Sequence, residues 1–153
     1  ELYSVSEDFH ARYSAISKEY LYKINIGIFN PIEEEYVYQY NEKLDIAKMQ
    51  ETAKIFIGKH DFRSFTSLDY EKDCTRIIYS INITIENDII SIDFIGNGFL
   101  KYMVRNIVGA LIEVGNGSKN IFDVQKILDA KDRKKAGICA SSNGLYLVNV
   151  NYS

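Results

Sequence analysis

An arginine interrupts a long apolar segment in the second half of the chain. Residues 96–109 read GNGFLKYMVRNIVG, and apolar side chains flank Arg105 at helical spacing. A buried guanidinium costs free energy unless a carboxylate or a phosphate meets it. The structural alternatives are that Arg105 reaches solvent or pairs with a local acid such as Asp93. The functional interpretation is that Arg105 orients an acidic group in a cleft, while Gly109, one turn later, would let another backbone approach closely.

Aromatic side chains gather on one predicted strand. Residues 18–28 read KEYLYKINIGI, in which apolar side chains recur at every second position, beginning with Tyr20 and Tyr22. This alternation is typical of a strand with one buried face, so both rings point the same way. Packing within the sheet is the structural alternative, because tyrosine favours strands. The alternation alone does not distinguish Tyr20 from Tyr22.

Other reactive side chains form no pattern that indicates chemistry. His10 and His60 are fifty residues apart without ligands at metal-binding spacing, so we expect no metal site. Ser64 beside His60 does not predict a nucleophile pair on spacing alone. Cys74 and Cys139 stand singly, which favours free thiols in a reducing cytosol over a disulfide.

Composition indicates a folded domain of ordinary size. The 153 residues are 46% hydrophobic and carry 18 basic and 21 acidic side chains, a formal net charge of −3. A chain of this length can bury enough surface to fold without a metal or a disulfide. The acidic total does not suggest a nucleic-acid partner, but it does not exclude one, because local patches matter more than the sum. The basic run 131–135 is typical of a solvated face, with phosphate contact as the secondary interpretation.

We expect neither a membrane span nor a secretory signal. No apolar run approaches the roughly 18 residues that a span needs. The chain opens Glu1-Leu2-Tyr3 without an apolar signal region or a methionine, so we expect a piece of a longer cytoplasmic protein.

Periodicity predicts strands that alternate with helices. Asp45 and Asn120 are candidate helix caps, and Asn87-Asp88 is typical of a hairpin turn. The predicted strands are 18–28, 36–40, 75–86, 89–95 and 144–151, and the predicted helices are 45–57, 99–114 and 120–130. This order predicts an α+β fold, a mostly antiparallel mixed sheet with helices packed on one face.

Five segments in order resemble the tRNA pseudouridine synthases of the TruA type. The segment GNGFLKYMVRNIVG is similar to the family's NGFLxxMVRNIVG. The others are FHARYSA at 9–15, KEYLY at 18–22, HDFRSF at 60–65, and KDRKKAG at 131–137 followed by GLYL at 144–147. The resemblance covers residues 9–152. Residues 138–143 lack the prolines common there in the family, so the path of this loop is not predicted.

The resemblance implies an isomerase that converts uridine to pseudouridine in the anticodon stem-loop of tRNA, acts as a cytoplasmic homodimer, and needs no cofactor or metal. The family's nucleophile is an aspartate in a Gly-Arg-Thr-Asp motif, and no Arg-Thr-Asp occurs in this sequence. We therefore expect residues 1–8 to be the tail of a preceding segment and 9–153 to be the C-terminal domain of the synthase, inactive alone. The alternative is a non-catalytic RNA-binding or dimerisation module with the same fold.

The resemblance also assigns roles to individual residues. Arg105 would hold the missing aspartate ionised, because a guanidinium nearby lowers a carboxyl pKa by about 1–3 units. Tyr20 would stack on the target base, and Leu145 would form an apolar wall of the pocket, with core packing as the alternative for each. The expected RNA contacts are basic: Arg12, Lys18 and Lys101. For Arg12, an ion pair within the fold is the alternative.

Overall fold

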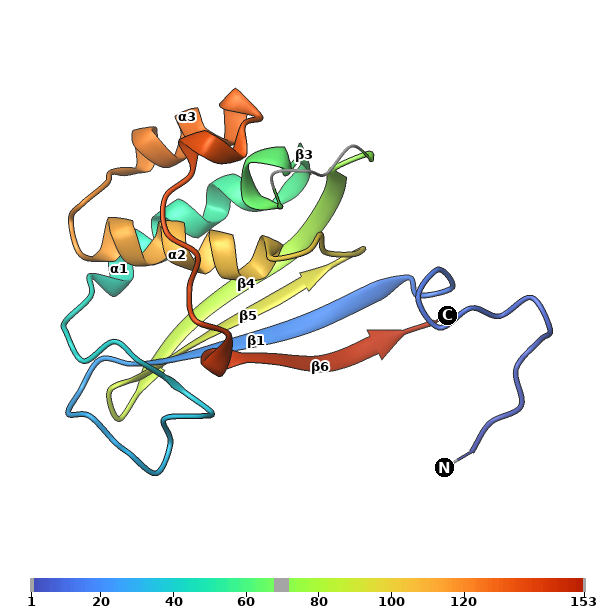
Figure 1. Ribbon diagram of the computed structural model, residues 1–153, viewed down its shortest axis with the longest axis horizontal. Coiled ribbons are helices and arrows are strands. Elements are labelled where there is room, and N and C mark those ends of the chain that lie inside the picture. Colours follow the sequence, from blue (N-terminus) through green and yellow to red (C-terminus); the bar gives the residue numbers. More distant parts are fainter. Residues whose placement is uncertain (1, 68–71, 153) are drawn as a thin grey trace.

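Two layers make up the computed structural model, which describes residues 2–67 and 72–152. Within these residues the strands are β1 (Ser17–Asn25), β2 (Tyr38–Gln39), β3 (Gly58–Asp61), β4 (Thr75–Glu86), β5 (Ile89–Gly96) and β6 (Leu145–Asn151). The helices are α1 (Ile46–Ala53), α2 (Met103–Gly115) and α3 (Ile121–Ala130). Figure 1 shows the three helices on one face of the sheet. The predicted α+β class is confirmed.

β1 lies at the junction of the sheet. It pairs antiparallel with β5 along one edge, and the sheet continues through β4 to β3. Its other edge is shared: β6 pairs antiparallel with Ser17–Tyr22, and β2 pairs parallel with the last two residues of β1. The start of β6 therefore lies beside the middle of β1, although the two are far apart in the sequence.

The β4–β5 hairpin forms as the sequence predicts. Asn87 and Asp88 have φ values of 49° and 64°, the left-handed conformation that a two-residue hairpin turn requires and that these side chains tolerate. Ile90, Ile92 and Phe94 of β5 are fully buried under the helices. Their alternation places Asp93 on the face of the sheet without helices.

Predicted caps fix the helix ends. The side chain of Asp45 accepts a hydrogen bond from the backbone N–H of Lys48 and begins α1. Asn120 and Asp123 form a reciprocal capping box at α3. Every residue of α2 is buried except Arg105, which confirms that this helix packs inside the molecule.

Two predicted strands have different bounds in the structure, and one strand was not predicted. The strand predicted over 18–28 ends at Asn25, because the Asn25 side chain bonds the backbone of Gly27 and Ile28 and turns the chain. The strand predicted over 36–40 is reduced to Tyr38–Gln39. The short edge strand β3 was not predicted, since its sequence GKHD holds none of the β-branched residues, Phe, Tyr or Trp that are enriched in strands.

The helix predicted over 99–114 begins only at Met103. Tyr102 precedes it in the left-handed conformation, with φ 63°, so residues 97–102 form a loop. The Thr66 hydroxyl donates to the carbonyl of Lys101 at 3.0 Å, and Asn97 bonds Ile77 through its backbone N–H and its side chain. These contacts use groups that a helix would have needed. Phe99 therefore lies in a loop beside the sheet and not on the helix.

Candidate active site

A cavity of about 550 Å³ lies where β1, the loop 97–102, the start of α2 and the start of β6 meet. Its lining includes all six residues that the sequence analysis singled out: Arg12, Lys18, Tyr20, Lys101, Arg105 and Leu145. These six come from five separate segments, and only the fold brings them together. We call this cavity the candidate active site.

Tyr20 and Leu145 form the wall on the sheet side. Tyr20 is partly buried on the helix-facing side of β1, and its ring meets the Phe99 ring edge to face at a centroid distance of 5.2 Å. Burial raises the pKa of Tyr20, so its phenol stays protonated at neutral pH. Leu145 pairs with Tyr22, two residue pairs along from Tyr20, and is partly buried. The ring and the leucine therefore give the cavity an apolar side for a planar ligand.

Arg105 lies in the first turn of α2 and is half-buried. Its Nε donates to the carbonyl oxygen of Ala140 at 2.7 Å, and its guanidinium carbon lies 5.4 Å from the centre of the Tyr102 ring. The two ion pairs among the described residues, Lys48–Asp45 and Lys119–Glu113, do not include it. Pairing with Asp93 is excluded, because that carboxylate lies on the opposite face of the sheet. The positive charge is thus held by a neutral carbonyl and is not neutralised by any described residue.

The donors of Arg105 are directed by this arrangement. Since Nε is occupied by Ala140, the two Nη groups, which donate no hydrogen bond to any described residue, remain available to an anion in the cavity. The first turn of α2 contains no acidic side chain. The helix dipole also favours negative charge at this end. The available Nη donors and the helix dipole both favour a carboxylate or a phosphate at this position.

Residues 137–141 form a strap that crosses α2 and holds Arg105 through hydrogen bonds to its side chain and its backbone. Ala140 accepts from Arg105 Nε and returns a bond from its N–H to the Arg105 carbonyl at 3.0 Å. Further along the helix, the buried Glu113 carboxylate accepts from the N–H of Ile138 at 3.0 Å and pairs with Lys119. At the C-terminal end of the strap, the Tyr22 hydroxyl donates to the Ser141 carbonyl.

Gly109 is the point at which the strap touches the helix. A Cβ built on Gly109 would overlap the carbonyl oxygen of Ile138 and lie 2.9 Å from its carbonyl carbon. The prediction that this glycine allows a close backbone approach is confirmed. The strap is followed by a 3-10 turn, Ser142–Gly144, and then by Leu145, so the chain that contacts Gly109 and Arg105 continues into the apolar wall.

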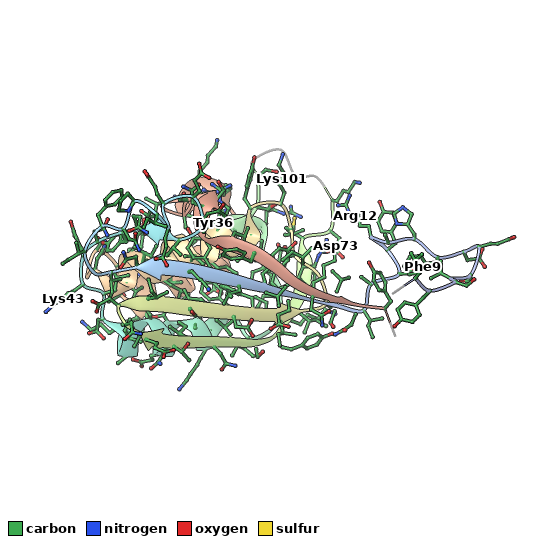
Figure 2. The ribbon with its side chains drawn as sticks, turned by 90° about the horizontal axis from the view of Figure 1, so that it is seen from below. Phe9, Arg12, Tyr36, Lys43, Asp73 and Lys101 are labelled. Carbon is green, nitrogen blue, oxygen red and sulfur yellow. The ribbon has the colours of Figure 1, made fainter. Side chains whose placement is uncertain are left out.

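Arg12 reaches the cavity from a hydrogen-bonded loop. The Nδ1 atom of His10 accepts from the backbone N–H groups of Arg12 and Tyr13 at 3.1 and 3.3 Å. The Tyr152 hydroxyl donates to the carbonyl of Ala11, which attaches this loop to the end of the sheet. No described residue forms an ion pair with Arg12, so the predicted alternative of a pair within the fold is not found. Figure 2 shows Arg12 and Lys101 along the same upper edge of the molecule.

The charge of the cavity is of one sign. Among the residues that the structure describes, its lining holds four cations and no carboxylate, together with the rings of Tyr20, Phe99 and Tyr102. A larger cavity of about 620 Å³ at the other end of the sheet contains Glu33, Glu86 and Asp88 and no aromatic side chain. Only the first of these two combines stacking surfaces with an excess of positive charge, which is the chemistry of a nucleotide site.

Two aromatic lining residues were missed as site residues. Phe99 and Tyr102 lie within the apolar segment, but the helix prediction assigned them to packing. The Gly96-Asn97-Gly98 run before them is a turn signal that could have placed them in a loop. Ser64 is not a nucleophile, because its hydroxyl donates to Ile127 and accepts from Asp132 in the interior.

Among residues 2–67 and 72–152 no group of three potential ligands could hold a metal ion. Both cysteines are free. No helix in this part of the chain is long and apolar enough to cross a membrane.

Comparison with known proteins agrees with this chemistry. The sequence model of a family described as tRNA pseudouridine synthase matches residues 52–153. A protein of Lactobacillus helveticus (strain DPC 4571) named tRNA pseudouridine synthase A is 44% identical, with 97% of this chain and 58% of that protein covered. A Clostridium tetani (strain Massachusetts / E88) protein named tRNA pseudouridine synthase A 2 is 45% identical, with 97% and 61% covered.

A third relative matches to a similar extent. A Shewanella woodyi (strain ATCC 51908 / MS32) protein named tRNA pseudouridine synthase A is 43% identical, with 97% of this chain and 58% of that protein covered. The chain therefore spans about three fifths of the length of the relatives it matches. With the family match extending over most of its residues, the chain belongs to the tRNA pseudouridine synthase family.

Proposed function

We propose that this chain is the C-terminal domain of an enzyme that isomerises uridine to pseudouridine in the anticodon stem-loop of tRNA. The observation that carries the proposal is Arg105, which lines a cavity beside Tyr20 without a carboxylate partner among the described residues. A cation held in this way is suited to an acid supplied by a segment outside the described residues. The relatives, of which the chain covers about three fifths, have room for such a segment.

The reaction sets three requirements for the site. The bond between N1 of uracil and the ribose breaks, the base turns, and a bond forms from C5 to the same ribose carbon. The proton of C5 is lost and N1 gains one, so the sum is an isomerisation that needs no redox cofactor. The target nucleotide must first leave the stack, at a cost of a few kcal/mol.

The described residues meet these requirements in different ways. Tyr20 and Leu145 give the freed uracil an apolar wall against which it can turn, and the neutral phenol adds no charge to repel it. Arg105 holds the incoming carboxylate ionised and oriented through charge-assisted hydrogen bonds. Arg12, Lys18 and Lys101 surround the opening with positive charge that attracts the RNA backbone.

The setting and assembly of the enzyme belong to the same proposal. We infer a cytoplasmic homodimer, as the family resemblance implies. The free cysteines agree with a reducing compartment. Exposed apolar side chains, among them Leu147 and Val148 on β6, agree with association through a sheet surface.

The test is pseudouridine formation by the full-length protein. Unmodified tRNA transcripts are incubated with the enzyme, and pseudouridine is counted by mass spectrometry and mapped by carbodiimide modification and primer extension. We expect conversion of uridine in the anticodon stem-loop, strongly reduced by Tyr20→Leu and unchanged by the distant Lys43→Ala. Binding of tRNA without any pseudouridine would contradict the proposal and favour the non-catalytic RNA-binding module.

A further inference from the structure

A second cavity adjoins the candidate active site. It has a volume of about 420 Å³ and shares Arg12, Lys18 and Phe99 with the first. Its remaining lining comes from the segment before β1, the residues around the start of β4 and the loop after β5, and includes Lys72, Asp73 and Arg76. We call it the side cavity. Because Arg12 and Lys18 line both cavities, a chain-like ligand that extends from one cavity to the other stays next to positive charge along its whole path.

Arg76 is held in place on the floor of the side cavity. Its Nη1 atom donates to the carbonyl oxygens of Thr75 and Asp73 at 2.7 and 3.2 Å. Gly98 leaves room over the guanidinium, because a Cβ built there would lie 3.6 Å from Arg76 Nε. No ion pair among the described residues includes Arg76. The side chain is therefore ordered by backbone carbonyls, while its charge stays available.

Asp73 is the one carboxylate among the described lining residues of the side cavity, and it is hydrogen-bonded locally. Asp73 accepts a hydrogen bond from the N–H of Thr75 at 2.9 Å. This bond and a second one from the Thr75 side chain, with the nearby charges of Arg76 and Lys59, hold the pKa of Asp73 below its ordinary value. The Asp73 carboxylate is therefore engaged by hydrogen bonds within its own turn. The described lining has a net positive charge, because it also contains four cations: Arg12, Lys18, Lys72 and Arg76.

We propose that the side cavity binds the phosphodiester backbone of the RNA nucleotides next to the one in the candidate active site. This inference rests on the proposed function and adds Lys72 and Arg76 as RNA-binding residues. A base that has left the stack displaces the flanking phosphates, and contacts to phosphate fix the register of a nucleic acid on a protein. The shared Arg12 and Lys18 give the strand a continuous path, and Tyr13 in the side cavity offers a ring beside it.

The experiment measures tRNA affinity of the full-length protein as a function of salt concentration. Each phosphate contact that is lost lowers the slope of log affinity against log salt by about 0.7–0.9. We expect Lys72→Ala and Arg76→Ala each to weaken binding by about 3–10-fold in 0.1 M salt and to lower the slope by about 1, and the double variant to lower it by about 2. Lys43→Ala is the matched control, since Figure 2 shows Lys43 at the opposite end from Arg12 and Asp73.

Two outcomes would overturn the inference. One is an unchanged slope in both single variants, and the other is a loss no larger than that of Lys43→Ala. Lys72 is exposed, so its variant tests the idea even where Arg76→Ala disturbs the turn at Asp73. An active wild-type enzyme with unchanged slopes refutes the side cavity alone. A wild type that forms no pseudouridine but shows the lowered slopes refutes the proposed isomerase and keeps the RNA path.

Discussion

Gly109→Ala tests whether the strap positions the catalytic groups. The new methyl would overlap the Ile138 carbonyl, so the strap must retreat from α2 by about 1 Å. Overpacking of this kind costs about 1–3 kcal/mol, partly offset by about 1 kcal/mol from the better helix propensity of alanine. The retreat carries Ala140 away from Arg105 Nε and shifts Leu145. A misplacement of about 1 Å at a reacting centre can lower a rate about 10²-fold.

The assay compares single-turnover pseudouridine formation and urea unfolding in the full-length protein. Gly115→Ala is the matched control, because it adds the same methyl to the same helix but meets Met49 and Leu44 in the core, away from the strap. We expect Gly115→Ala to lose stability and keep its rate, and Gly109→Ala to lose about 10²-fold in rate at temperatures where it is folded. Equal rates in the two variants would refute the role of the strap.

Two further predictions concern protonation and loop geometry. Burial and the nearby Glu19 carboxylate raise the pKa of Asp93 to about 6. The folded state therefore binds this proton more tightly than the unfolded chain does. As a result, we expect the free energy of unfolding to fall as the pH rises from about 4 to about 6. Asp93→Asn should remove this decrease in the unfolding free energy and stabilise the protein at pH 7 by about 1 kcal/mol, a value that allows for solvent screening. A pH profile of urea unfolding that is unchanged by the substitution would contradict this. His10→Ala should raise KM for tRNA several-fold by freeing the backbone of Arg12, and His10→Asn should restore part of it, since its carboxamide oxygen can accept the same bonds. Identical KM values for the two His10 variants would show that the imidazole does not hold the loop.

The sequence allowed those features to be predicted whose cause is local. The Asn87-Asp88 turn, the caps at Asp45 and Asn120, and the alternation of β5 each depend on a few neighbouring residues. Gly109 belongs with them in part, because a glycine inside a buried helix predicts a close neighbour. The identity of that neighbour, the strap, could not be predicted, since its contacts reach across the fold to Glu113, Arg105 and Tyr22.

The loop before α2 shows the limit most clearly. Phe99 and Leu100 continue the apolar pattern of the helix, yet long-range hydrogen bonds from Thr66 and to Ile77 hold residues 97–102 in a loop. The site residues quoted from the family motifs line one cavity. Phe99 and Tyr102 join them through this loop, and Arg76 lines the side cavity from the strand beside it. The motifs in the sequence therefore predicted which side chains gather in the cavity better than they predicted the path of the backbone around it.

Arg105 provides the most direct measurement of the central claim, that this chain contributes a cation which needs a carboxylate from elsewhere. The rate of pseudouridine formation is measured under single-turnover conditions with enzyme in excess, beside the dissociation constant for tRNA. We predict that Arg105→Ala lowers the rate by about 10²–10³-fold or more, with affinity changed by less than about 10-fold, and that Arg105→Lys lies between Arg105→Ala and wild type. A rate for Arg105→Ala within a few-fold of wild type, with tRNA bound, would contradict it.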